Sequence, residues 1–144
     1  MVLPSARNKA MDLLSRREHS YKELFDKLRL RNFEADDISS ALDKLLSENL
    51  LNDERFTESY VHYRVQKGFG PLRIKNELSE KGIDGELVQS QMEIYDSIWS
   101  ELMQKQRIKK FGAEIPEDYK EKMKQARFLQ NRGFSPESVM RLFR

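Results

Sequence analysis

The chain contains no cysteine among its 144 residues. That absence excludes disulfides and any metal or redox site built on thiolates. There are two histidines, His19 and His62, so a histidine-rich metal site is not expected either. No apolar run approaches the about 18 residues of a membrane-spanning helix, and residues 1–4 do not look like the hydrophobic region of a signal peptide. We expect a soluble intracellular protein with no membrane segment.

Signals for β-strands are also scarce. β-branched residues are few, and no segment alternates apolar and polar residues for long. Apolar residues make up 38% of the chain and charged residues 35%, which suits several small helical cores better than one large core. Helix start and stop signals are dense. They predict an all-α fold with helices over about 5–16, 20–32, 36–46, 52–68, 70–82, 84–92, 95–111, 118–132 and 135–143.

The strongest pattern in the chain is a repeat of apolar positions. A first set recurs 50 residues later and again, less completely, 51 residues after that. A fixed period of this length is typical of one supersecondary unit used several times. The three sets are Leu24, Leu28, Phe33, Ile38 and Leu42; Ile74, Leu78, Ile83, Val88 and Met92; and Leu129, Phe134, Val139 and Phe143. We therefore expect three tandem three-helix repeats, over 1–51, 52–96 and 97–144, with helix-turn-helix-like geometry.

Residues that turn or cap helices recur with the same period. Asn32, Gly82 and Gly133 belong to the residue types that enter the left-handed backbone region most cheaply, so each can end a helix. Ser20 begins a capping box, and a proline after Gly70 suits the first helical position. We assign structural turns and caps to Ser20, Asn32, Asp53, Gly70, Pro71, Gly82 and Gly133.

Charge is unevenly distributed along the chain. The net charge is +2, but residues 97–144 carry eleven basic and six acidic side chains. A basic surface favours an anionic partner, although solvated helix faces carry many lysines for no such reason. A stretch rich in tyrosine and basic residues over 60–75 is a second candidate surface, unless its aromatic rings pack inward. Our candidates for partner contact are Arg64, Lys67, Arg73, Lys75, Arg127 and Arg132.

Catalysis has little support in the sequence. There is no glycine-rich phosphate loop of the Walker type, and His19, directly before a helix cap, is interpreted as a surface or capping residue. Sequence-specific DNA reading is disfavoured too. The helices that would enter the major groove begin with acidic residues, at Asp36, Asp84 and Glu137, which would face phosphates badly. The sequence predicts neither an enzyme nor a bound cofactor.

Three blocks of the chain resemble a known family. The central block is Leu50-Leu51-Asn52-Asp53-Glu54-Arg55-Phe56, followed by Tyr60-Val61, Arg64, Lys67-Gly68, Gly70-Pro71, Arg73-Ile74, Glu77-Leu78 and Lys81-Gly82-Ile83. The outer blocks are Arg17-Glu18-His19-Ser20 with Glu23-Leu24 and Leu28, and Arg127-Phe128-Leu129-Gln130 with Arg132-Gly133-Phe134. Together they are similar to the RecX family, with Asn52 where the family usually has aspartate and Thr57 where alanine is common.

The resemblance implies both a fold and a function. It implies a curved, elongated array of three three-helix repeats in a cytoplasmic, non-enzymatic modulator of the RecA recombinase. Such a protein lies in the groove of the RecA–single-stranded-DNA filament and inhibits ATPase, strand exchange and coprotease activity in DNA repair and the SOS response. It does so by blocking filament extension or promoting disassembly. We expect a monomer with weak non-specific DNA binding; the alternative is a stand-alone, sequence-non-specific DNA-binding protein.

Overall fold

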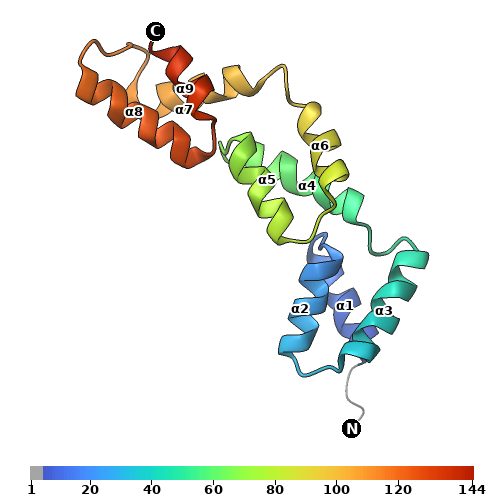
Figure 1. Cartoon of the computed structure of the whole chain (residues 1–144). Coiled ribbons are helices and arrows are strands. Elements are labelled where there is room, and N and C mark those ends of the chain that lie inside the picture. Colours follow the sequence, from blue (N-terminus) through green and yellow to red (C-terminus); the bar gives the residue numbers. More distant parts are fainter. Residues whose placement is uncertain (1–4) are drawn as a thin grey trace. The chain divides into compact units, whose positions relative to one another are not determined.

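A computed structural model describes residues 5–144, and all the regular structure in that range is helical (Figure 1). Residues 1–4, where we expected no signal peptide, lie outside the described range. Within it, no helix is long and apolar enough to cross a membrane. The helices are α1 (Ala6–Arg16), α2 (Tyr21–Leu30), α3 (Ala35–Ser47), α4 (Asp53–Gln66), α5 (Pro71–Glu80), α6 (Gly85–Glu93), α7 (Trp99–Phe111), α8 (Tyr119–Arg132) and α9 (Pro136–Leu142).

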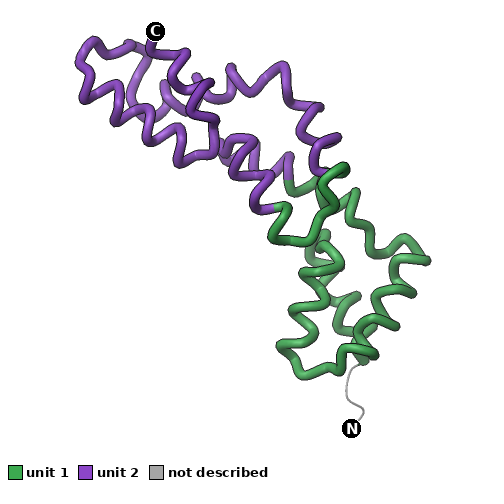
Figure 2. Tube along the Cα trace, in the orientation of Figure 1, with its two compact units in different colours: residues 1–60, 78–87 green, residues 61–77, 88–144 purple. Residues whose placement is uncertain are grey.

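The chain forms two compact units (Figure 2). Of the described residues, unit 1 contains 5–60 and 78–87, and unit 2 contains 61–77 and 88–144. The division runs through α4, α5 and α6, so it does not follow the repeats expected from the sequence. The repeat boundaries at 51/52 and 96/97, and the curved, elongated arrangement, stay predictions.

The core of unit 1 lies among α1, α2 and α3. α2 presents Leu24 and Leu28 four residues apart, on one face, and both are fully buried. From α3, Ile38 and Leu42 join them, and Ala10 of α1 completes the cluster. The apolar repeat read from the sequence therefore lies in a helical core here.

The core of unit 2 contains a polar residue at a position that is apolar in the other two repeats. Gln125 of α8 stands where the other repeats have Leu24 and Ile74, and it is 3% exposed. Its side-chain oxygen accepts a hydrogen bond from Arg107 of α7, which is itself 1% exposed. Arg107 also donates to the backbone carbonyls of Gly112, Ala113 and Glu114. A buried guanidinium thus fastens the break between α7 and α8, and Gln125 is one of its acceptors.

The turns expected from the sequence have left-handed backbone conformations. Asn32, Gly82 and Gly133 have φ angles of 68°, 76° and 107°. Ser20 forms the expected capping box, in which its hydroxyl accepts from the backbone N–H of Glu23 and the Glu23 carboxylate accepts from the backbone N–H of Ser20. The three left-handed residues set where α2, α5 and α8 stop, and the capping box sets where α2 starts.

Asp53 caps a helix, but not the helix that it begins. α4 is capped by Asn52, whose side-chain oxygen accepts from the backbone N–H of Arg55 at 2.9 Å. Asp53 instead accepts from the backbone N–H of Tyr21 at 2.8 Å, so it caps the start of α2 from another helix. Burial raises the pKa of Asp53, an effect that the bond from Tyr21 partly opposes. Local sequence shows that Asp53 can accept a hydrogen bond, but not from which helix.

Two contacts join successive repeats at equivalent positions, and we call them joints. In the first joint, within unit 1, the Ser20 hydroxyl donates to the carbonyl of Lys81 at 2.8 Å, and Lys22 Nζ donates to that of Glu80 at 2.9 Å. In the second, within unit 2, Gly70 N donates to the carbonyl of Arg132 at 2.8 Å. Residues 20 and 70 correspond by the repeat, as do residues 81 and 132. In both joints the start of one repeat's second helix meets the final turn of the next repeat's second helix.

Candidate partner-binding surface

Arg64 is anchored at the corner between α4 and α5. Its guanidinium pairs with both carboxylate oxygens of Glu77, at 2.9 and 2.7 Å. It also lies 3.8 Å from the centre of the Phe69 ring. The side chains of Arg64 and Glu77 are only 16% and 20% exposed, and such bidentate pairs fix geometry as well as charge. Arg64, expected to contact a partner, is thus largely occupied within the protein.

Two further guanidinium groups surround the same ring. Arg73 of α5 lies 4.4 Å and Arg132 of α8 lies 4.9 Å from the Phe69 centroid. Arg73 also lies 3.6 Å from Glu77. We call Arg64, Arg73 and Arg132, with Phe69 and Glu77, the arginine–phenylalanine cluster. It holds three positive charges against one negative charge, so it carries a surplus of positive charge on the surface of unit 2.

Hydrogen bonds from arginine side chains to backbone carbonyls at the second joint hold the cluster together. Arg73 donates to the carbonyl of Asn131 at 3.2 Å, and Arg132 donates to that of Lys67 at 3.4 Å. The Cβ of a residue larger than glycine at 70 would lie 2.6 Å from the carbonyl carbon of Gly133. Gly70 is therefore required for the close approach that brings α5 and α8 together.

Aromatic rings and cations continue outward from the cluster. Arg132 also lies 5.4 Å from the centre of the Phe128 ring, and Lys110 lies 5.7 Å from it. Lys67 lies 5.5 Å from the ring of Tyr63, which is 55% exposed. A cation near the face of an aromatic ring is attracted to that ring by about 0.5–2 kcal/mol. Such a surface can bind phosphate or carboxylate groups and stack on planar groups.

Three of the six candidate residues lie outside this cluster: Lys67 is beside it, where its carbonyl accepts from Arg132, and Lys75 and Arg127 lie elsewhere. Lys75 is two positions after Arg73 on α5, so it points to another face of the helix. Arg127 of α8 is exposed and lines an open groove of about 650 Å³ together with Tyr119, Met123 and Met140. Neither makes an ion pair with another described residue. The structure brings together Arg64, Lys67, Arg73 and Arg132 but not Lys75 and Arg127.

Sequence reasoning missed several members of this surface. Glu77 was read only as part of a family block, and Lys110 and Phe128 were not connected with Phe69. A local signal existed for Glu77, because it follows Arg73 by four residues on one helix. No comparable signal links Lys110, Phe128 and Arg132 to Phe69, since the turns at residues 68 and 133 bring them together only in the folded chain.

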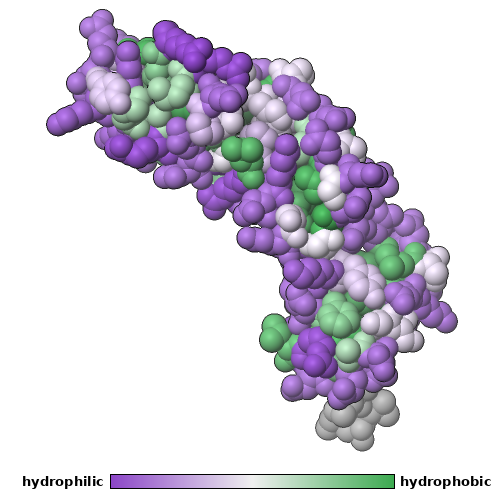
Figure 3. Space-filling view, viewed as in Figure 1, coloured by the Kyte–Doolittle hydropathy of each residue, from purple (hydrophilic) through white to green (hydrophobic). Residues whose placement is uncertain are grey.

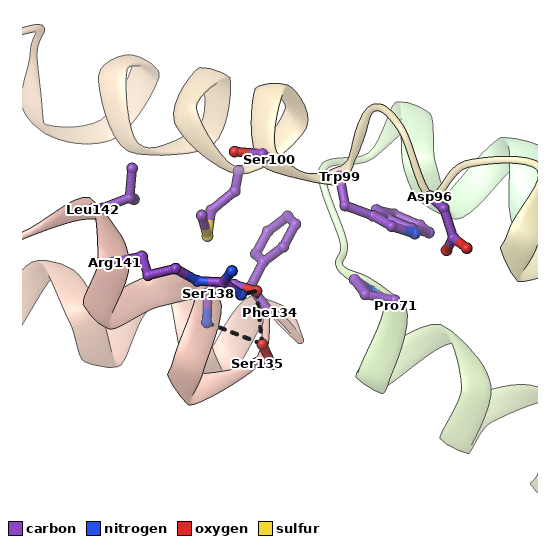
Figure 4. Close-up of a pocket in the computed structure, with 10 residues that line it drawn as sticks. Pro71, Asp96, Trp99, Ser100, Phe134, Ser135, Ser138, Arg141 and Leu142 are labelled. Atoms are coloured by element: carbon purple, nitrogen blue, oxygen red, sulfur yellow. Dashed lines mark hydrogen bonds between the residues drawn. The ribbon is translucent and has the colours of Figure 1, made fainter.

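On the visible faces of both units, hydrophilic side chains surround smaller hydrophobic areas (Figure 3). One hollow in unit 2 has a volume of about 430 Å³ (Figure 4). Trp99 and Pro71 lie at one end beside Asp96, and Arg141 lies at the other. Ser135 accepts from the backbone N–H of Ser138 and caps α9 there. The hollow has a mixed lining and no cluster of groups suited to catalysis.

Among residues 5–144, no group of histidine and acidic residues could hold a metal ion. Of the two histidines, His19 is 2% exposed, so its interpretation as a surface residue was wrong. Its Nδ1 lies 3.1 Å from the carbonyl of Arg17, and Lys27 Nζ donates to its Nε2 at 2.8 Å. Burial lowers the pKa of His19, and the positive charges of Arg17 and Lys27 act in the same direction.

The buried His19 predicts a stability change in mild acid. The folded chain keeps His19 neutral below its usual pKa of 6.5, whereas the unfolded chain binds a proton there. The contribution of neutral His19 to the free energy of unfolding is therefore fully present above pH 6.5 and is lost as the pH falls below that value. We expect the urea midpoint of the wild type to fall between pH 7.5 and 5.5, and that of His19→Gln to fall less. His62→Gln, at an exposed position, is the control, and an equal fall in all three proteins would contradict the prediction.

A second acid-dependent effect arises from Glu23. Although burial raises its pKa, hydrogen bonds from Arg17 and from the backbone of Ser20, with the charge of Lys81, lower it to about 2. The stabilisation from this carboxylate is complete above its usual pKa of 4.5 and is lost as the pH falls toward about 2. It does not overlap the range in which His19 acts.

The fold and the basic surface together indicate the class of protein to which the chain belongs. The chain is an all-α protein of repeated three-helix units, with a cationic, aromatic-lined surface on one of its joints. The family models of the first, second and third three-helix domains of RecX match residues 6–45, 52–90 and 100–143. The chain belongs to the RecX family. The all-α fold of three three-helix domains expected from the sequence is thereby confirmed.

Individual relatives agree with this assignment. The chain is 42% identical over 141 residues to the regulatory protein RecX of Pseudomonas fluorescens strain SBW25, covering 98% of this chain and 91% of that one. It is 39% identical over 140 residues to the regulatory protein RecX of Ectopseudomonas mendocina, covering 97% and 93%. A crystal structure of RecX from Lactobacillus salivarius matches with a TM-score of 0.76 and 28% identity, covering 96% and 94%.

Proposed function

We propose that this protein regulates the RecA recombinase by binding RecA and its single-stranded-DNA filament, in the filament groove. The observation that carries the proposal is the RecX family match over residues 6–143. The protein acts without chemistry of its own, in the cytoplasm, in DNA repair and control of the SOS response. It inhibits the ATPase, strand-exchange and coprotease activities of RecA by blocking filament extension or promoting disassembly.

The arginine–phenylalanine cluster is our candidate for the contact with the filament. Lys67, Arg73 and Arg132 supply exposed or partly exposed charge, while Arg64 holds Phe69 and Glu77 in position. Lys75 and Arg127 extend the contact from other faces of α5 and α8. These cations suit acidic groups of RecA or the phosphates of its bound strand. Several such contacts, each weak, add up when one chain touches several identical subunits.

The direct test is the state of the filament. Purified protein at a substoichiometric ratio is expected to shorten RecA–single-stranded-DNA filaments seen by electron microscopy and to lower the DNA-dependent ATPase rate in parallel. One bound molecule affects the many subunits that would have added behind it, so the effect exceeds the molar ratio. Unchanged filament length and ATPase at an equimolar ratio would refute the proposal.

A second candidate is supported by the cations and rings around Phe69 and Phe128. Proteins that bind single strands without sequence preference combine basic grooves with stacking aromatic rings. As a stand-alone DNA-binding protein, this chain would bind DNA tightly without RecA, and its affinity would fall steeply with salt. A salt slope near zero, or weak binding at physiological salt, would leave RecA regulation as the better account.

A further inference from the structure

Each joint pairs the start of one helix with the turn that ends another. One helix start and one such turn have no partner of this kind among the described residues. The starts of α2 and α5 are used in the first and second joints, against the turns that end α5 and α8. The turn that ends α2, at residues 29–33, and the segment that starts α8, at residues 117–121, have no such partner among the described residues. A repeat array always leaves an unsatisfied surface at its two terminal repeats.

The turn that ends α2 is open and apolar at its tip. Leu30 is 82% exposed, the highest value among the large hydrophobic side chains of residues 5–144. Arg29 and Arg31, on either side of it, are exposed as well. Arg31 corresponds by the repeat to Lys81 and Arg132, whose carbonyls accept the hydrogen bonds of the two joints. This turn therefore presents the acceptor half of a joint, flanked by positive charge.

The start of α8 is exposed as well. Tyr119, its first residue, is 72% exposed, second only to Leu30 among the large hydrophobic side chains described. Glu117 and Asp118 before it are exposed, and Asp118 caps the helix by accepting from Glu121 N at 3.1 Å. In contrast, Ser20 and Gly70, at the starts used in the joints, are buried. α8 has 14 residues where α5 has 10, so its start reaches about one turn further out.

We propose that the turn at residues 29–33 of one molecule binds the start of α8, residues 117–121, of a second copy of this chain. Two features agree with that occupant. The contact covers the two most exposed large hydrophobic side chains of the described residues, and it brings Arg29 and Arg31 to Glu117 and Glu121. Lys120, and Glu34 just beyond the turn, oppose this complementarity in part. The proposal does not depend on RecA.

Because two different surfaces meet, the contact is heterologous and can continue from copy to copy. Few residues meet on each side, so we expect association at high protein concentration. The monomer expected from the sequence is then the dilute state.

Since the chain has no cysteine, cross-linking can test the geometry directly. Single-cysteine variants Leu30→Cys and Tyr119→Cys are mixed with a short bismaleimide linker, and cross-linked dimer is measured on a denaturing gel. Leu30→Cys with Ile94→Cys is the control, because Ile94 is 67% exposed but lies at neither surface. We expect several-fold more mixed dimer from the Leu30 and Tyr119 pair. Equal yields from both pairs would overturn the proposal.

Charge reversal supplies a second, solution-state test. The mean mass in sedimentation equilibrium is expected to rise with wild-type concentration, and to stay monomeric for Arg31→Glu alone and for Glu117→Lys alone. Mixing the two variants restores association, because each reversed surface then meets its complement. A monomeric wild type at the highest soluble concentration, or association that survives both single reversals, would overturn the proposal.

Discussion

Replacing Arg107 with methionine is expected to destabilise unit 2. The methionine fills much of the volume but donates no hydrogen bond, so the carbonyls of Gly112, Ala113 and Glu114 and the side chain of Gln125 lose their donor. Each buried acceptor left unsatisfied costs about 1–3 kcal/mol. Residues 112–114 are exposed, so water can reach their carbonyls, while the side-chain oxygen of Gln125 is buried. We therefore expect the free energy of unfolding to fall by about 1–3 kcal/mol.

Urea unfolding followed by the fluorescence of Trp99 measures this effect. Trp99 is the single tryptophan of the chain and packs partly buried against the core of unit 2. Lys109→Met, at an exposed position in the last turn of α7, removes one positive charge without touching the break. A loss in Arg107→Met no larger than in this control would mean that Arg107 does not fasten the segment between α7 and α8.

The second large effect is expected at Gly133. This residue has φ +107°, and a Cβ added to it would lie 2.4 Å from Cβ of Arg73 and 2.8 Å from its backbone nitrogen. Gly133→Ala must therefore strain the backbone and push α5 from α8, which together cost about 2–5 kcal/mol. It separates Arg73 from Arg132, so we also expect binding through the arginine–phenylalanine cluster to weaken.

Gly112→Ala is the matched control for this substitution. Gly112 has φ +91°, and a Cβ there would meet nothing within 4 Å, so the control carries the backbone strain without the clash. The difference between the two variants in thermal unfolding measures the packing of the second joint. Similar losses of stability would show that the joint relaxes easily and that Gly133 matters only for its backbone conformation.

The helix ends and the buried faces of each repeat could be predicted, because the residues that determine them are close together in the sequence. Asn32, Gly82 and Gly133 end helices through their own backbone preferences, and Leu24 and Leu28 show the buried face by spacing alone. The start of α7 was placed near residue 95, but the helix begins at Trp99. Tyr95 instead lies in a turn, and the centre of its ring is 5.6 Å from that of Trp99. Such a side-chain contact leaves no clear mark on helix periodicity.

Polar residues were harder to predict because their partners are distant in the chain. Arg107 reads as one of eleven basic residues in the last third, and only the fold shows that it is buried. His19 is buried in the fold, and the residues next to it in the sequence give no sign of this. Arg64 was expected to face a partner, yet Glu77, 13 residues away, holds it. The sequence indicated which residue types are present, while the fold decides which of them meet.

The candidate surface follows the same rule. Composition pointed to basic residues in both the middle and the last repeat, and four of the six chosen lie at one corner of unit 2. What sequence could not supply was the reason for that grouping, which is the close approach of Gly70 and Gly133 at the second joint.

The most direct test of the account compares how two matched variants act on RecA. Lys67→Glu with Arg132→Glu reverses the half-buried charge of Arg132 in the cluster and the exposed charge of Lys67 beside it. Lys109→Glu with Lys124→Glu makes the same charge change elsewhere on unit 2. The measurement is the single-stranded-DNA-dependent ATPase rate of RecA as each protein is titrated in, with helicity checked by circular dichroism. We predict that the wild type and the control pair suppress the rate below stoichiometric ratios and that the cluster pair loses most of this suppression. Equal suppression by both folded pairs would contradict the cluster as the contact surface, and no suppression by the wild type would contradict RecA regulation itself.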